Sequence, residues 1–315
     1  MSATPVRAPR SATPTESVTR EGLRLRHRAE NLRGWLYCSP FLFFFILFLV
    51  WPTIYGLYMS FTGLTLTGAN TGWVGVDNYV EAFADPEVWS SLGNTLWFTV
   101  LSSIPLVVIA LALAVLVNVG LPGQWFWRLS FFLPYLLAST VISLFWKWIF
   151  NPQLGLLNTM IGWVGLEPVQ WLNDENWAMH GVVIATVWWT IGFNFLLYLA
   201  ALQAIPDQLY EAASLDGAGT WRKFTHITLP QLAPTTVLVV VLQILASLKI
   251  FDQIYQMTGG GPAGATRPIL QYVYEAGFTG YRLGYASAIS YIFFFIIIAI
   301  SVAYTVAISR RSVKS

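Results

Sequence analysis

Long intervals without charged side chains recur along the chain and predict membrane-spanning helices. A helix needs about 20 apolar residues to cross the roughly 30 Å hydrocarbon core of a bilayer. Six intervals that are free or nearly free of Asp, Glu, Lys and Arg meet this requirement. We expect their helices at 36–59, 92–117, 129–150, 181–203, 224–250 and 284–308. One such helix fits the core of a globular protein, but six across the chain predict an all-α membrane protein with six transmembrane helices.

The composition supports a membrane protein and excludes several other classes. Only 32 of the 315 residues are charged, which is 10%, whereas soluble domains carry about 25%. Hydrophobic residues make up 56% of the chain. The net charge of +2 does not favour a nucleic-acid partner. Cys38 is the only cysteine, which excludes an intrachain disulfide and a cysteine-rich metal site.

The basic residues predict the orientation of the helices. With the N-terminus inside, the cytoplasmic side holds 13 of the 17 Lys and Arg residues. The predicted outer segment 62–91 holds four acidic residues and no base. Because loops rich in Lys and Arg stay in the cytoplasm, we expect both termini there. The inner basic residues are Arg7, Arg10, Arg20, Arg24, Arg26, Arg28, Arg33, Arg128, Arg222, Lys223, Arg310, Arg311 and Lys314.

Three regions follow from this topology. Residues 1–33 are basic, begin with a stretch rich in Ser, Thr, Pro and Ala, and are expected to form a disordered cytoplasmic tail. Residues 34–309 form the predicted six-helix domain, and residues 310–315 form a short cytoplasmic C-terminal tail.

The predicted inner loop between the fourth and fifth spans, residues 204–230, has its own helical signals. Pro206 and Asp207 suit a first helical turn. Gly217 suits the end of this helix, since glycine accepts a left-handed conformation. Thr220 is expected to cap a second helix, and Pro230 to open the fifth span. The first helix carries an apolar stripe of Leu209, Ala212, Ala213 and Leu215.

The same loop resembles a known motif. The motif-like residues are Glu211-Ala212-Ala213, then Asp216-Gly217 and, after nine intervening residues, Ile227-Thr228-Leu229-Pro230. They resemble the EAA motif of binding-protein-dependent ATP-binding-cassette importer permeases. Other stretches make the chain similar to the first-permease subunit of carbohydrate importers of the maltose and glycerol-3-phosphate type. It departs from the maltose representative in lacking a large extra outer domain. These stretches are Trp51-Pro52, Gly75-Val76-Asp77-Asn78-Tyr79, Asn94-Thr95, Leu133-Pro134, Thr258-Gly-Gly-Gly-Pro262 and Gly284-Tyr-Ala-Ser-Ala-Ile289.

The resemblance implies a role for the loop and a set of partners. In such importers the loop forms a coupling helix that sits in a groove of the ATPase subunit. This role would fall to Glu211, Ala212, Ala213, Asp216 and Gly217. The implied partners are a second, heterodimeric permease, two ATP-binding-cassette subunits and an extracytoplasmic solute-binding protein. The implied location is the cytoplasmic (inner) membrane of a bacterium or an archaeon.

The chain is expected to hold no cofactor of its own and to be no enzyme. It contains no G-x-x-x-x-G-K-[ST] sequence, so a P-loop for ATP is absent from it. ATP and Mg²⁺ would be bound by the partner ATPase subunits.

Polar and aromatic residues inside the fourth and fifth spans predict the substrate pathway. Polar groups in a span cost free energy and therefore suggest function. A sugar needs an aromatic platform together with hydroxyl and amide partners, and similar permeases line their sugar pathway with these two helices. The candidates are Thr186, Trp189, Thr190, Phe193, Asn194, Gln243 and Ser247. The alternative for each polar residue is a hydrogen bond that holds the helix bundle together.

Two other functions, an ion-coupled secondary transporter and a membrane enzyme, fit the sequence less well. An ion-coupled secondary transporter usually has a carboxylate inside the membrane, but none of the 15 acidic residues lies in a predicted span. A membrane enzyme needs a catalytic cluster, and the outer acidic residues have no basic or histidine partner nearby in sequence. The lysines inside the predicted spans, Lys147 and Lys249, lie toward outer ends, which favours a neutral sugar.

Overall fold

A computed structural model describes residues 35–120 and 122–312. The predicted tail at 1–33 and residues 313–315 of the predicted C-terminal tail lie outside the described residues. The chain divides into two units, residues 1–56 and 57–315, which are described separately. The described part of the first unit belongs to a helix, Trp35–Ser60, that continues across the boundary. This helix includes a π-helical turn, η1 (Ile46–Val50), and α2 (Trp51–Ser60).

Proline follows two of the π-helical turns at the same distance. η1 ends two residues before Pro52, and η3 (Phe224–Thr228) ends two residues before Pro230. Proline has no N–H and its ring collides with the carbonyl four residues earlier in a regular α-helix. Those carbonyls belong to Phe48 and His226, which lie within the π turns. The helix therefore widens at the point of conflict and continues past each proline.

The fifth predicted span begins earlier than expected. α10 (Thr220–Lys223), η3 and α11 (Leu229–Leu248) form one helix of 29 residues, Thr220–Leu248. The prediction that Pro230 opens the span is therefore wrong. The N-cap is Gly219, and Thr220 is the first helical residue rather than the cap.

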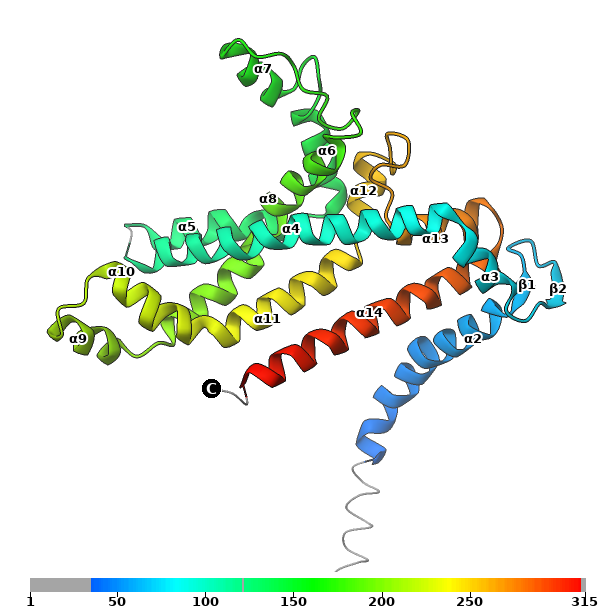
Figure 1. Ribbon diagram of the computed structural model, residues 1–315, viewed down its shortest axis with the longest axis horizontal. Helices are drawn as coiled ribbons and strands as arrows, with labels where there is room; N and C mark the ends of the chain where they lie inside the picture. Colours follow the sequence, from blue (N-terminus) through cyan, green and yellow to red (C-terminus); the bar gives the residue numbers. More distant parts are fainter. Residues whose placement is uncertain (1–34, 121, 313–315) are drawn as a thin grey trace, which may run out of the picture. The chain divides into compact units, whose positions relative to one another are not determined.

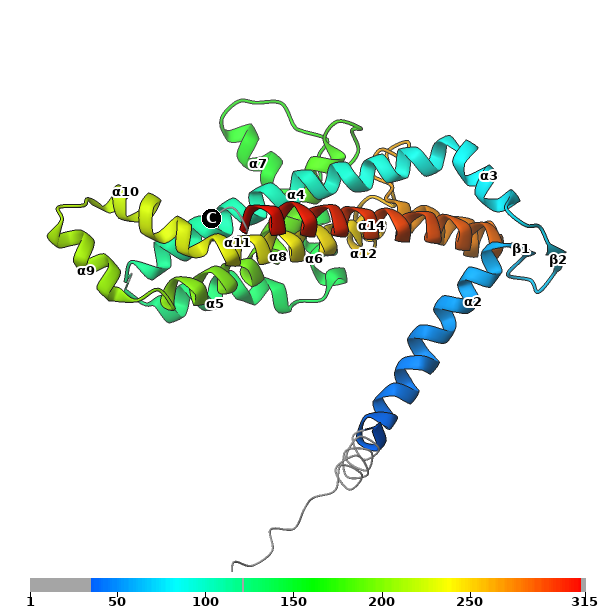
Figure 2. The same ribbon diagram turned by 60° about the horizontal axis from the view of Figure 1, so that its bottom comes forward.

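Four long helices organise the second unit. They are α4 (Pro86–Asn118), α8 (Ala178–Gln203), α11 and α14 (Leu283–Ser312), and α4 packs against both α8 and α11. α9 (Asp207–Leu215) and α10 lie at one end of α4 (Figures 1 and 2). α3 (Asp77–Ala84) and a small hairpin lie at its opposite end.

The third predicted span is broken. α5 (Gln124–Phe132) runs into a 3₁₀ turn, η2 (Leu133–Leu136), and α6 (Ser139–Ile149) then leaves at 101°. The prediction of one continuous helix over 129–150 is wrong. Pro134 removes a helical N–H donor, and Leu137 and Ala138 follow in extended conformations with ψ near 147° and 145°.

Several short elements connect the long helices. The sequence pattern missed α7 (Leu156–Trp163), α12 (Asp252–Met257), α13 (Ile269–Tyr274) and η4 (Glu275–Thr279). Strands β1 (Thr62–Leu64) and β2 (Asn70–Trp73) pair antiparallel, with Thr62 opposite Trp73. This hairpin departs from the all-α prediction, although the described chain is mostly helical.

Five described helices are long and apolar enough to cross a membrane, and the bent pair α5–η2 and α6 brings the number of spans to as many as six. Buried apolar side chains of the second unit form three clusters. One lies among α4, α8 and α11, and a second among α4, α6, α8 and α12. The third joins α3, α4, α13 and α14. The placement of both termini in the cytoplasm stays a prediction.

Candidate functional site

A cavity of about 340 Å³ opens between α8 and α11. The rest of its lining comes from Phe98 of α4, Tyr135 of η2, Gln253 of α12 and Ile250, which lies between α11 and α12. The seven candidates that the sequence predicts all line this one cavity: Thr186, Trp189, Thr190, Phe193, Asn194, Gln243 and Ser247. The structure therefore brings together side chains that the sequence places on two separate spans.

A chain of hydrogen bonds crosses the cavity wall from α8 to α4. Asn194 Nδ2 donates to Gln243 Oε1 at 3.0 Å, and Gln243 Nε2 donates to Ser247 Oγ at 2.9 Å. The hydroxyls of Ser247 and Ser102 share the next bond, at 3.1 Å. All four side chains are buried. These bonds hold three helices together, and they also fix the amide groups in one orientation beside the cavity.

A second polar pair links α8 to the short helix α12. Thr186 Oγ1 donates to Gln253 Oε1 at 2.8 Å, and Gln253 is only 1% exposed. Gln253 was not predicted, because α12 has six residues and lies outside the long apolar intervals. Its burial, which only the structure shows, is what identifies it as part of the site.

The aromatic wall of the cavity depends on the broken span. Tyr135 of η2 stacks on Phe193 with ring centroids 5.5 Å apart. Trp189 Nε1 donates to the Leu137 carbonyl at 3.2 Å. This bond satisfies a carbonyl in the extended segment that separates η2 from α6. Tyr135 was not predicted, because a straight helix over 129–150 does not indicate which side chain faces α8.

Gly192 allows the broken span to approach α8 closely. A Cβ atom at Gly192 would lie 2.3 Å from the Phe131 carbonyl oxygen and 2.7 Å from Phe132 Cα. Backbone atoms cannot move aside as a flexible side chain would. Gly192 therefore sets the distance between α5 and α8 and, through it, the position of Tyr135 against Phe193.

We expect Gly192→Ala to destabilise the protein by about 1–3 kcal/mol, the usual cost of overpacking a close contact. The midpoint of thermal unfolding of the purified protein in detergent measures this. Gly93→Ala is the matched control, because Gly93 is also helical and no atom lies within 4 Å of its added Cβ. An equal loss of stability in the two variants would contradict the close-contact role of Gly192.

The five predicted coupling residues lie on an exposed knob. Glu211, Ala212, Asp216 and Gly217 are exposed, and Ala213 is half-buried. The Glu211 carboxylate forms no ion pair or hydrogen bond with the residues that the structure describes. The expected apolar stripe also faces outward, since Leu215 is 90% exposed.

Other residues anchor this knob. Tyr210 packs against the buried cluster of α4, α8 and α11, and its hydroxyl lies 2.9 Å from Thr228 Oγ1. Lys223 Nζ donates to Ser214 Oγ at 2.6 Å. α9 is thus held from one side by Tyr210 and Ser214, which leaves Glu211, Ala212 and Leu215 free for a partner.

Gly217 ends α9 as the sequence predicts. Its φ is +77°, its N–H donates to the Ser214 carbonyl, and the Ala218 N–H donates to the Ala213 carbonyl. This pair of bonds is the Schellman motif, which requires a left-handed residue at this position. Gly219 has φ of −71° and instead begins the next helix.

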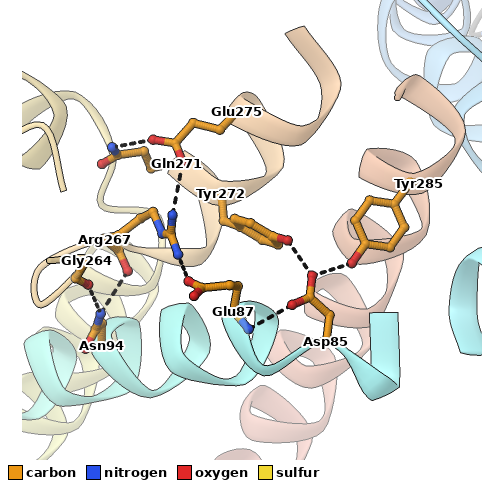
Figure 3. A network of polar contacts seen from close by, with 9 residues as sticks. All are labelled: Asp85, Glu87, Asn94, Gly264, Arg267, Gln271, Tyr272, Glu275 and Tyr285. Carbon is orange, nitrogen blue, oxygen red and sulfur yellow. Dashed lines mark hydrogen bonds and ion pairs between the residues drawn. The ribbon is translucent and has the colours of Figure 1, made fainter. Parts of the chain in front are cut away.

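A polar network joins the first turn of α4 to α13 and α14 (Figure 3). Asp85 caps α4 by accepting the Glu87 N–H at 2.9 Å. Its other oxygen accepts the hydroxyls of Tyr272 and, at 2.6 Å, Tyr285. Burial, together with the hydrogen bond to Asp85, raises the pKa of Tyr272, so its hydroxyl stays a donor at neutral pH.

Two acidic residues that the sequence analysis expected outside, Glu81 and Glu87, pair with bases far along the chain. Arg267 pairs with Glu87 and, at 3.5 Å, with Glu275, while Arg282 pairs with Glu81 at 2.5 Å. The hydrogen bond to Glu81 raises the pKa of Arg282. Sequence proximity showed no basic partner, because Glu81 and Arg282 are 201 positions apart.

Asn94 fastens the loop before α13 to the same helix. Its Nδ2 donates to the carbonyls of Gly264 and Arg267 at 2.9 and 3.1 Å (Figure 3). The Ile269 N–H donates to Thr95 Oγ1 at 2.9 Å. The Gly-rich segment 258–264 is therefore a structural loop, although Gly259, Gly261 and Gly264 have the G-x-G-x-x-G spacing of dinucleotide-binding loops. Within the described ranges, no cluster of His, Cys, Asp and Glu could hold a metal ion.

Comparison with known proteins places these features in context. Residues 82–315 match the family described as "Binding-protein-dependent transport system inner membrane component". The chain is 36% identical to the "Probable ABC transporter permease protein YurN" of Bacillus subtilis, over 83% of this chain and 93% of the relative. It is 37% identical to the "sn-glycerol-3-phosphate transport system permease protein UgpA" of Agrobacterium fabrum, over 85% and 91%.

A solved structure is similar along nearly the whole chain. It belongs to a bacterial ABC transporter involved in the import of the acidic polysaccharide alginate. The TM-score is 0.79 at 27% identity, and the match covers 91% of this chain and 99% of the other.

Proposed function

Because the chain belongs to the family of binding-protein-dependent transport system inner membrane components, we propose that it is the permease subunit of an ATP-driven importer for a sugar or an oligosaccharide. As a multi-pass component of the cytoplasmic membrane, it would form half of the translocation pathway. A second permease would supply the other half, two ATP-binding-cassette subunits the energy, and an extracytoplasmic solute-binding protein the sugar.

One observation carries this proposal: the two helices that line the cavity are also the two helices joined by the knob. α8 ends at Gln203, four residues before α9 begins, and α11 continues the helix that starts at Thr220. Gln243 lies 23 residues along that helix, or about 35 Å at 1.5 Å per residue. A displacement of α9 by a partner would therefore pass through rigid helices to the cavity wall.

The contacts of the knob suit a docking role. Ala212 presents little side chain, so a partner backbone can approach closely, and Glu211 offers an unpaired carboxylate to a basic residue. We therefore assign ATPase coupling to Glu211, Ala212, Ala213, Asp216 and Gly217. The substrate pathway is assigned to the seven predicted residues of the cavity, with Gln253 and Tyr135 added from its lining.

The main alternative, an ion-coupled secondary transporter, finds less support. Proton and sodium coupling usually relies on a carboxylate inside the membrane. No acidic residue lines the cavity among the residues that the structure describes. The half-buried acid Asp85 caps the start of α4 and already accepts two tyrosine hydroxyls and a backbone N–H.

Reconstitution tests the proposal. The chain is co-expressed with the second permease, the ATPase subunit and the binding protein encoded by neighbouring genes, and the complex is placed in proteoliposomes. We expect uptake of radiolabelled sugar only when ATP is present on the ATPase side and binding protein on the other. Ionophores that collapse proton and sodium gradients should leave uptake unchanged. Uptake that needs a gradient but no ATP would overturn the importer assignment in favour of a secondary transporter.

A further inference from the structure

The cavity between α8 and α11 contains no ionised side chain. Its described lining consists of amides, hydroxyls, aromatic rings and aliphatic groups. Lys249 and Asp252 flank the cavity in sequence, but both are exposed and neither lines it. Lys147 lines a different, outer cavity and donates to the Gln256 carbonyl at 3.3 Å. A substrate in the cavity between α8 and α11 would therefore meet no counter-ion from this chain.

The polar side chains of the cavity wall offer both hydrogen-bond donors and hydrogen-bond acceptors to a ligand. The bonds along Asn194, Gln243 and Ser247 use one N–H of each amide and leave the second N–H of each available. The Asn194 side-chain oxygen is an acceptor that makes no bond to the described residues. A sugar hydroxyl donates and accepts, so it can satisfy both kinds of group, whereas a carboxylate or phosphate accepts only.

Because the polar side chains of the cavity wall are buried, the lack of a counter-ion among them disfavours a charged ligand. Asn194, Gln243 and Gln253 are between 1% and 8% exposed, so water gives little screening at this wall. An ion that leaves water without a paired charge loses far more solvation free energy than a hydroxyl that finds a hydrogen-bond partner. Resting on the proposed importer function, we infer that this cavity accepts uncharged sugar rings and rejects sugars that carry a carboxylate, phosphate or sulfonate. The selecting element is the buried amide chain Asn194–Gln243–Ser247.

The aromatic side chains fit the same ligand. Trp189 and Tyr135 line the cavity beside Phe193, and the side-chain bond from Trp189 to Leu137 fixes the orientation of its indole ring. Ring faces carry a negative quadrupole. They therefore attract the C–H faces of a pyranose and add no stabilisation to an anion. Recognition would combine stacking on the rings with hydroxyl contacts to the amides.

Saturation-transfer NMR on the assembled, nucleotide-free importer in nanodiscs tests this without the binding protein, which could impose its own selectivity. The probes are matched pairs, methyl β-D-glucopyranoside with its uronate and methyl β-D-galactopyranoside with its uronate. We expect at least one neutral glycoside to bind with at least tenfold higher affinity than its uronate, a difference of about 1.4 kcal/mol.

A change of charge in the wall provides the matched variants. Leu242 lines the cavity and is apolar, so Leu242→Arg should raise the affinity for the uronate at least tenfold, while Leu242→Met should leave the preference unchanged. Ala246→Lys replaces the first variant if it does not fold. Equal binding of both members of a pair by the unmodified protein would overturn the inference, as would binding of neither. ATP-driven uptake in proteoliposomes would still test the importer assignment separately.

Discussion

Replacing Asn194 by Leu is expected to lower sugar uptake at least tenfold. The substitution removes the amide that faces the cavity and leaves Gln243 Oε1 without its donor on a buried wall. An unsatisfied buried polar group costs about 1–3 kcal/mol. Gln243→Leu should act in the same way, because it also removes the partner of Ser247. The initial rate of ATP-driven uptake in proteoliposomes measures the effect.

The double variant separates substrate binding from helix packing. When both members of a buried hydrogen-bonded pair become apolar, neither is left without its partner, and stability can return to nearly its original value. Ser247 loses the Gln243 donor but keeps its hydrogen bond to Ser102. We therefore expect the Asn194→Leu, Gln243→Leu protein to regain thermal stability and complex assembly while uptake stays lost. Recovery of uptake together with stability would show that the pair only holds α8 to α11. The same result would remove both residues from the proposed pathway.

The sequence could predict the helices and one face of the cavity because both depend on local patterns. The fourth span needed only a long apolar interval, and the spacing of Thr186, Thr190 and Asn194 placed them on one side of it. The structure places α8 at Ala178–Gln203, close to the predicted 181–203. The end of α9 was also predictable, since only a glycine readily adopts the φ of +77° found at Gly217.

The parts that could not be predicted depend on contacts between distant segments. Breaking the third span at Leu137 and Ala138 requires a partner for the freed carbonyl, and Trp189 on another helix supplies it. α4 begins at Pro86, six residues before the predicted start at residue 92. The apolar interval stops at the charged residue Glu87, but Asp85 caps the helix two residues earlier, so the helix includes Glu87 in its first turn. The pairing of Glu81 with Arg282 depends on the packing of α3 against α14, which no local pattern reports.

Gly217→Val and Glu211→Lys are expected to uncouple ATP hydrolysis from sugar. At φ of +77° a β-branched side chain is strained by about 1–3 kcal/mol, so valine should unwind the Schellman turn that ends α9. Lysine at position 211 reverses the charge that α9 offers to its partner. Loss of one member of a desolvated charge pair costs about 2–5 kcal/mol at an interface. Both changes lie on the exposed knob, so the helix bundle should still insert and fold.

The measurement is ATPase activity of the reconstituted complex with and without sugar-loaded binding protein. We expect at least a tenfold loss of stimulated activity in both variants, from reduced ATPase binding or from loss of the response to sugar. Gly219→Val and Gln208→Lys are the matched controls. Gly219 has φ of −71° and no atom within 4 Å of an added Cβ, and Gln208 is exposed on the same helix outside the motif. Full stimulation in both Gly217→Val and Glu211→Lys would mean that α9 does not transmit the signal. The coupling role would then have to lie in another segment, because α9 carries the motif and the exposed surface on which this assignment rests.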